Sequence, residues 1–132
     1  MKKLIDSAIK ASQNAYAPYS KYRVGAAILM KDGNIITGVN VENASYGLTN
    51  CAERSALFSA ISQGYKKEDI EAMSIIAGEE VIGAPCGACR QVMYELVPKE
   101  AKLYLSNLKG EYEVSSTEKL LPGAFGPEDL DV

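Results

Sequence analysis

The chain has 132 residues, of which 47% are hydrophobic and 23% are charged, and its net charge is −3. This length suits one domain with a full core, so we treat residues 1–132 as a single domain. A negative net charge argues against nucleic acid as a partner, because a nucleic-acid-binding face is basic. No apolar run approaches membrane-spanning length. The three cysteines, an odd number, fit a reduced cytoplasmic protein better than a disulfide framework.

Hydrophobic periodicity predicts helices and strands in mixed order. The predicted elements are a helix from residue 4 to near residue 18, strands over 24–30 and 35–41, a helix over 51–63, a strand over 73–77, a helix over 85–97, strands over 103–105 and 112–114, and a short helix near 117. Asp32 and Gly33 form a hairpin turn signal between the first two strands. Asn50 is a candidate N-cap for the second helix and Gly64 its end, while Pro85 opens the third helix.

This order of elements restricts the topology of the sheet. Two helical crossovers precede the third and the fourth strands, and they imply parallel neighbours at these two strands. The connection between the last two strands is too short for a parallel return, so they pair antiparallel. We therefore expect an α/β fold of three layers, α/β/α, with a mixed five-stranded sheet whose last strand is antiparallel.

The most informative residues are the cysteines, which occur in two clusters in a chain without histidine. Cys86 and Cys89 are three residues apart at a helix start, so their side chains share one face and both sulfurs can reach one zinc ion. Cys51, at the start of another helix, completes a set of three thiolates. A structural zinc site normally has four protein ligands, whereas a catalytic site keeps three and leaves the fourth position for water. The sequence therefore predicts a zinc hydrolase.

Glu53 is the carboxylate nearest to these cysteines along the chain. It lies about 200° around the helix from Cys51, so it is poorly placed as a fourth ligand and better placed to carry protons to and from the water. A structural alternative is a capping box with Asn50, which would use the same carboxylate.

A zinc site with three thiolates carries excess negative charge, because the three thiolates outweigh the +2 charge of zinc. Arg54 follows Glu53, and Arg90 follows Cys89, so each cluster has its own cation. We predict that both guanidiniums donate hydrogen bonds to thiolate sulfurs and compensate this charge.

Two other interpretations of the cysteines stay open on local sequence alone. Cys86-Gly87-Ala88-Cys89 also fits a thioredoxin-like redox pair, although such a pair needs neither Cys51 nor Glu53. A non-catalytic binding module stabilised by zinc is the second alternative, but it lacks a fourth protein ligand.

Cys-Ala-Glu followed by Pro-Cys-x-x-Cys resembles the signature of the zinc-dependent nucleoside and nucleobase deaminases. Nearly the whole chain is similar to the small cytidine deaminases that hold zinc with three cysteines. The stretches that carry the resemblance are residues 15–21, 39–44, 50–54, 85–92 and 120–125. The resemblance implies one Zn²⁺ per subunit, held by Cys51, Cys86 and Cys89, and hydrolytic deamination of cytidine and 2′-deoxycytidine in pyrimidine salvage. Glu53 would carry the protons.

The resemblance also implies roles for substrate-binding residues. Asn40 and Glu42 match residues that hydrogen-bond the ribose, Tyr22 stands where many relatives have Phe against the substrate, and the backbone of Ala52 reads the pyrimidine edge. Two further aromatic residues match side chains that reach the pocket from neighbouring subunits, namely Tyr46 and Phe125. We therefore expect a homotetramer with shared active sites. Deamination of another cytosine-containing nucleoside is the nearest rival activity.

Overall fold

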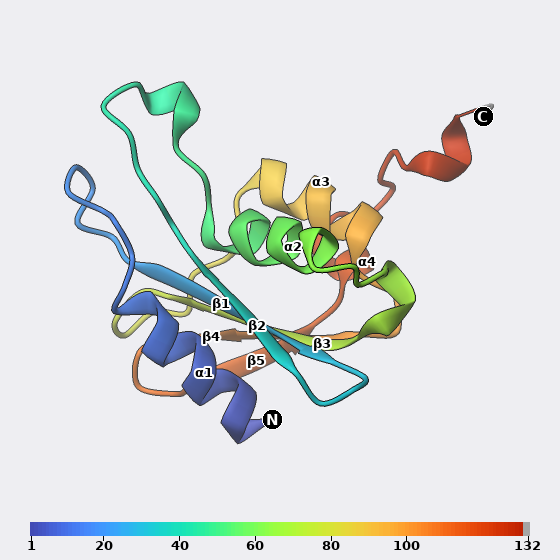
Figure 1. Ribbon diagram of the computed structural model, residues 1–132, viewed down its shortest axis with the longest axis horizontal. Helices are drawn as coiled ribbons and strands as arrows, with labels where there is room; N and C mark the ends of the chain where they lie inside the picture. Colours follow the sequence, from blue (N-terminus) through green and yellow to red (C-terminus); the bar gives the residue numbers. More distant parts are fainter. Residues whose placement is uncertain (131–132) are drawn as a thin grey trace.

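The computed structural model describes residues 1–130, so residues 131 and 132 of the expected single domain lie outside the described range. Its centre is a sheet with the strand order β2-β1-β3-β4-β5 (Figure 1). The strands are β1 (Val24–Met30), β2 (Ile35–Val39), β3 (Ile70–Ala77), β4 (Lys102–Ser106) and β5 (Tyr112–Ser115). The α-helices are α1 (Lys2–Ser12), α2 (Ala52–Ser62), α3 (Gly87–Leu96) and the single turn α4 (Thr117–Leu120).

The pairing of the strands confirms the predicted mixed sheet. β3 and β4 are parallel, because the chain crosses over through α3 between them. The crossover through α2 does not make β2 and β3 neighbours, because β1 lies between them. β5 returns from β4 by a short turn and pairs with it antiparallel, as predicted. β1 lies between β2 and β3 and is antiparallel to both.

Helices cover both faces of the sheet (Figure 1). α1 covers one face, where Leu4, Ile5 and Ala8 pack with Ala27 and Ile76. α2 and α3 cover the other face over a larger cluster that includes Ile28, Met73, Met93 and Leu103. Successive residues of β1 contribute to opposite clusters, as the two-residue period of a strand requires. The resulting α/β/α layers are those predicted from the sequence.

Two glycines allow the helices to lie close to the sheet. A Cβ added at Gly25 in β1 would overlap the carbonyl oxygen of Ala8 in α1. On the other face, a Cβ at Gly38 in β2 would overlap the backbone of Ala52 and Ala56 in α2. The absence of a side chain at Gly38 therefore allows the first turn of α2 to lie close to the sheet.

Several boundaries differ from the sequence prediction. α1 ends at Ser12 rather than near residue 18, β2 ends at Val39 rather than residue 41, and β3 begins at Ile70 rather than residue 73. The expectation that Asn50 caps α2 was wrong, because Cys51 is the N-cap residue and the Asn50 Nδ2 donates to Ser55 Oγ instead. Helix α3 begins one residue after Cys86, its N-cap. Within residues 1–130, no helix combines the length and apolar character needed to cross a membrane.

Candidate metal centre and substrate cavity

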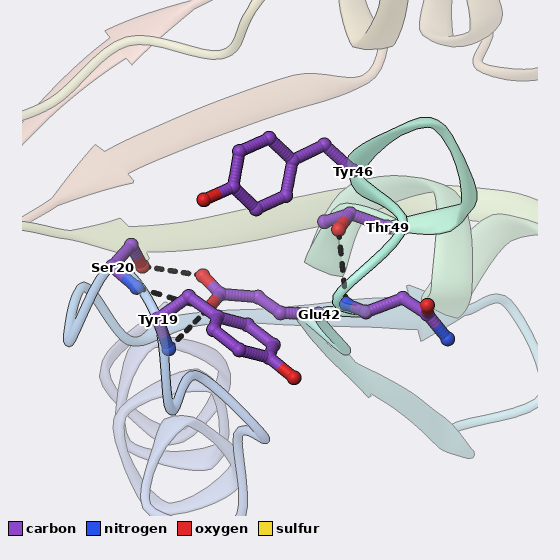
Figure 2. A pocket seen from close by; sticks show the side chains of 6 residues that line it. Tyr19, Ser20, Glu42, Tyr46 and Thr49 are labelled. Atoms are coloured by element: carbon purple, nitrogen blue, oxygen red, sulfur yellow. Dashed lines mark hydrogen bonds between the residues drawn. The ribbon is translucent and has the colours of Figure 1, made fainter.

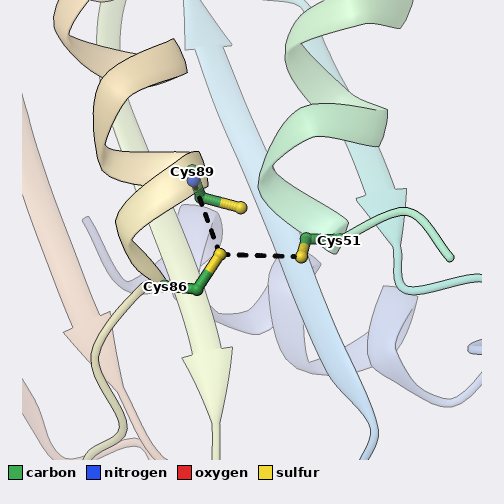
Figure 3. A group of neighbouring side chains, drawn as sticks. All are labelled: Cys51, Cys86 and Cys89. Atoms are coloured by element: carbon green, nitrogen blue, oxygen red, sulfur yellow. Dashed lines mark hydrogen bonds between the residues drawn. The ribbon is translucent and has the colours of Figure 1, made fainter. Parts of the chain in front are cut away.

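The three cysteines lie together where α2 and α3 begin, side by side on the same face of the sheet (Figure 3). The Sγ atoms of Cys51 and Cys86 are 3.9 Å apart, and all three Sγ atoms lie within 4.8 Å of one another. Sulfurs bound to one tetrahedral zinc at 2.3 Å are about 3.8 Å apart. The donor set and its spacing therefore fit a zinc ion.

The thiols of Cys86 and Cys89, at the start of α3, have pKa values shifted in opposite directions. The backbone N–H of Cys89 donates to Cys86 Sγ at 3.4 Å. Partial burial opposes ionisation of Cys86, but the hydrogen bonds from Cys89 outweigh it and lower its pKa. Cys89 is fully buried, and burial together with the charge of Glu53 raises its pKa. Burial thus favours the protonated form of Cys89. A bound cation would favour its thiolate form instead, because a coordinated thiol loses its proton.

Glu53 lies in the first turn of α2, beside the cysteines. Its side chain is only 4% exposed, and burial raises the pKa of its carboxyl. A carboxyl with a raised pKa exchanges protons near neutral pH more readily than an exposed one. The structural alternative of a capping box with Asn50 does not hold, because Glu53 is two residues after the N-cap Cys51 rather than three.

The two arginines make different contacts. Arg54 Nη2 donates to Cys51 Sγ at 3.2 Å, the contact expected from the sequence. The same expectation for Arg90 was wrong. Its Nε donates to the carbonyl oxygen of Pro85 at 2.8 Å, and its Nη1 donates to that of Leu120 at 2.9 Å. These two carbonyl groups lie outside regular strand pairing, so they compete successfully with sulfur for the Arg90 guanidinium.

A cavity of about 300 Å³ opens next to the cysteines. It is lined by residues from the loop before β1, the end of β2, the start of α2 and the loop before α3, namely Ser20, Tyr22, Val24, Asn40, Glu42, Thr49, Asn50, Cys51, Ala52, Glu53, Ala84 and Cys86. Four of the predicted substrate-binding residues are thus gathered in one place with Glu53 and two cysteines. Tyr46 and Phe125 do not line this cavity.

Asn40 is held tightly by the backbone around the cavity. Its Nδ2 donates to the carbonyl oxygen of Tyr22 at 2.8 Å, and its Oδ1 accepts from the N–H of Val24 at 2.9 Å. The Asn40 side chain is 7% exposed. Asn40 therefore braces the Tyr22 wall, and its second Nδ2 hydrogen is its remaining donor.

Glu42 organises the loop that precedes β1 (Figure 2). Its carboxylate accepts hydrogen bonds from the N–H groups of Tyr19 and Ser20 and from the Ser20 hydroxyl. The Ser20 hydroxyl, with the N–H groups, lowers the pKa of Glu42. Ser20 was not among the predicted site residues, although it lies within residues 15–21, which carried the family resemblance.

The two remaining predicted residues lie on the surface. Tyr46 is 78% exposed at the short 3₁₀ helix Tyr46–Leu48 and, with Tyr19 and Glu42, lines a neighbouring cavity of about 350 Å³ (Figure 2). Phe125 is 58% exposed in the segment after α4, where its carbonyl oxygen accepts from Gln91 Nε2 at 2.8 Å.

Comparison with known proteins gives a consistent result. Residues 1–105 match the family described as the cytidine and deoxycytidylate deaminase zinc-binding region. The chain is 55% identical over 128 residues to the cytidine deaminase of Halalkalibacterium halodurans, covering 97% of this chain and 96% of that one. It is 49% identical to the cytidine deaminase of Sporosarcina psychrophila, with coverage of 98% and 94%.

A solved structure agrees with these sequence matches. The cytidine deaminase of Burkholderia pseudomallei superposes with a TM-score of 0.89 at 50% identity, covering 93% of this chain and 97% of that one. The chain belongs to the zinc-binding cytidine and deoxycytidylate deaminase family.

Proposed function

We propose that the protein catalyses the hydrolytic deamination of cytidine and 2′-deoxycytidine to uridine and 2′-deoxyuridine, with release of ammonia. The observation that carries this proposal is the buried Glu53 carboxyl, which lines the same cavity as Cys51 and Cys86. A redox pair has no use for the third cysteine, and a structural zinc module has no use for a buried acid at this point. Family membership at up to 55% identity supports the same reaction.

Cys51, Cys86 and Cys89 would hold the zinc ion, because their sulfurs are the soft donors that zinc prefers and lie at suitable spacing. Zinc, when bound, supplies Lewis-acid activation of water. Arg54 donates to Cys51 Sγ and so withdraws electron density from one thiolate. This donation would partly offset the excess negative charge of three thiolates.

Glu53 would move the protons. The carboxylate takes one proton from the attacking water and delivers it to N3 of the pyrimidine as oxygen bonds to C4. It then takes the remaining proton of that oxygen and delivers it to the departing amino group, which leaves as ammonia while the C4 carbonyl forms. One carboxylate in reach of all these atoms suffices for the sequence.

The polar residues at the other end of the cavity would bind the sugar. Asn40 offers its free Nδ2 hydrogen, and Glu42 offers the acceptor capacity left on its carboxylate. Tyr22 forms a wall of the cavity, and the backbone of Ala52 lies where α2 begins, with its first N–H groups free to face a ligand.

Exposed aromatic residues support a homotetramer with shared sites. Tyr46, Leu48 and Phe125 are 78%, 71% and 58% exposed, so their side chains are available for contacts with neighbouring subunits. Tyr46 and Phe125 would complete the substrate pockets of neighbouring subunits. We place the enzyme in the cytoplasm, where the thiols stay reduced and where it would serve pyrimidine salvage.

The test is to mix purified, zinc-loaded protein with cytidine and to follow ammonia release. We expect prompt release that a zinc chelator abolishes, from a species whose mass by light scattering is four times that of the chain. Cytidine monophosphate and other cytosine nucleosides serve as comparison substrates. No release from a zinc-loaded tetramer with any of them would refute the proposed reaction.

A further inference from the structure

The segment that brings Cys86 to the cysteine cluster has no regular secondary structure. It runs over residues 78–86, from the end of β3 to the start of α3, and its Ala84 lines the substrate cavity together with Cys86. One internal hydrogen bond closes the segment, from the N–H of Gly83 to the carbonyl oxygen of Ala77 at 3.1 Å. Such a segment needs outside contacts to hold one conformation.

Arg90 holds the end of the segment at Pro85, and the contacts to its first half come from the turn between β4 and β5, at Asn107. The Asn107 side chain is fully buried, and all four of its hydrogen-bonding positions are used. Its Oδ1 accepts from the N–H groups of Lys109 and Glu111 at 3.0 and 3.1 Å, and its Nδ2 donates to Glu111 Oε1 at 2.8 Å. These three contacts hold the turn itself.

The fourth contact of Asn107 leaves the turn. Its Nδ2 donates to the carbonyl oxygen of Glu80 at 2.6 Å, in the middle of the segment before Cys86. The neighbouring N–H of Leu108 donates to the carbonyl oxygen of Gly78 at 3.0 Å. The ion pair between Lys109 and Glu80 joins the same two segments, but both side chains are mostly exposed, so it contributes little.

On its other side, the segment packs against Tyr22, which lines the substrate cavity. A Cβ added at Gly83 would lie 2.9 Å from the Tyr22 hydroxyl oxygen, so the tyrosine is packed directly against the segment. A shift of residues 78–86 would therefore move a cavity wall as well as a cysteine.

We propose that Asn107 is a positioning residue for the reaction: its hydrogen bond to Glu80 sets the segment that places Cys86 and supports Tyr22. The inference rests on the proposed function, since it assigns Cys86 to the metal and Tyr22 to the substrate. Asn107 touches neither metal nor substrate, and its effect passes entirely through the backbone of residues 78–86.

The variant Asn107→Asp combined with Glu111→Gln isolates the contact with Glu80. The carboxylate introduced at position 107 keeps an oxygen that accepts from the turn N–H groups, and the amide introduced at position 111 donates to its second oxygen, so the turn is preserved. The donor to the Glu80 carbonyl is lost, and a buried carboxylate oxygen that repels this carbonyl takes its place. Glu111→Gln alone is the matched control, and Asn107→Ser, whose hydroxyl also caps turns, replaces the double variant should that variant fail to fold.

Three measurements are made on the zinc- or cobalt-loaded tetramer. Hydrogen exchange at the amides of Gly83 and Leu108 reports on the segment, and we expect it to be about 10-fold faster in the double variant than in the control. The visible absorption of the cobalt-substituted protein reports on the cysteine geometry, and we expect its bands to shift. For cytidine, kcat/KM should fall about 10-fold, with a contribution from KM through Tyr22.

Faster exchange without a change in the cobalt spectrum or in kcat/KM would overturn the inference, because Asn107 would then serve the turn alone. An unchanged rate of hydrogen exchange at Gly83 and Leu108 would also overturn the inference, because the segment would then not depend on Asn107. A wild-type protein that binds no metal and releases no ammonia would instead refute the proposed function, and exchange at Gly83 would still show whether Asn107 holds the segment.

Discussion

Arg54 donates from Nη2 to Cys51 Sγ at 3.2 Å, whereas Arg90, the corresponding residue of the other cluster, donates to two backbone carbonyl groups. The two cations therefore act on different parts of the molecule. The first acts on a sulfur, and the second holds the loop before α3 and the end of α4 to each other.

This difference predicts separate effects of two matched substitutions. Arg54→Gln should reduce kcat for cytidine about 10- to 100-fold while most of the zinc is retained, because the sulfur loses a charged donor. Arg90→Gln should chiefly lower the free energy of unfolding, by about 1–3 kcal/mol, because two carbonyl groups lose their partner. Zinc content, steady-state kinetics and urea denaturation of both variants make the comparison, and equal loss of kcat in the two would contradict the assignment.

Glu53→Gln tests the proton path. The amide is nearly isosteric with the carboxyl but carries no exchangeable acid proton, so we expect zinc to stay bound and turnover to fall more than about 100-fold. Metal analysis of the purified variant provides the control. Turnover within a few-fold of the wild type would show that another group carries the protons.

The pH dependence of stability should reveal the role of Glu42. Hydrogen bonds from Ser20 lower its pKa below the ordinary 4.5, so the folded state favours the carboxylate form. This stabilisation is fully present above the unfolded-state pKa and is lost as the pH falls through the lower folded-state pKa. Glu42→Gln should therefore be less stable than the wild type at pH 7, and the difference should shrink at about pH 3. Urea denaturation at both pH values measures it, and a pH-independent difference would contradict the prediction.

Gly38→Ala and Gly25→Ala form a matched pair on opposite faces of the sheet. Each added methyl group overlaps helix backbone, so each should cost about 1–3 kcal/mol of stability. Gly38→Ala alone displaces the first turn of α2, which follows Cys51 and contains Glu53. It should therefore weaken zinc retention and kcat beyond its effect on stability, whereas Gly25→Ala should leave both near wild type in the folded protein. Chelator competition and kinetics distinguish the two.

Local patterns were sufficient to predict the sheet and the cysteine cluster. The antiparallel pairing of β4 with β5 follows from the short connection between them, and the position of Cys51, Cys86 and Cys89 at helix starts follows from their spacing and flanking residues. Glu53 was placed beside them for the same reason. These features depend on spacing within a segment, which a sequence displays directly.

Contacts between distant segments could not be predicted in this way. The amide of Asn40 is bonded to the backbone at Tyr22 and Val24, and Arg90 is bonded to the carbonyl group of Leu120, 30 residues away. Which carbonyl group lacks a partner depends on the folded path of both segments, so composition and periodicity carry no signal for it. The same holds for Asn107, whose buried role is invisible in a turn-forming sequence.

The two cysteine clusters lie in successive crossover connections of the sheet, with a separation of 35 positions from Cys51 to Cys86. A metal ion bound to both clusters thus joins the two ends of a long loop in the folded protein, and because the unfolded chain has no preformed site, its binding free energy adds to the free energy of folding. The catalytic ion would then also link the start of α2 to the start of α3. We expect these two helices to separate from each other first when the metal is withdrawn, while the β1–β3 centre of the sheet stays paired.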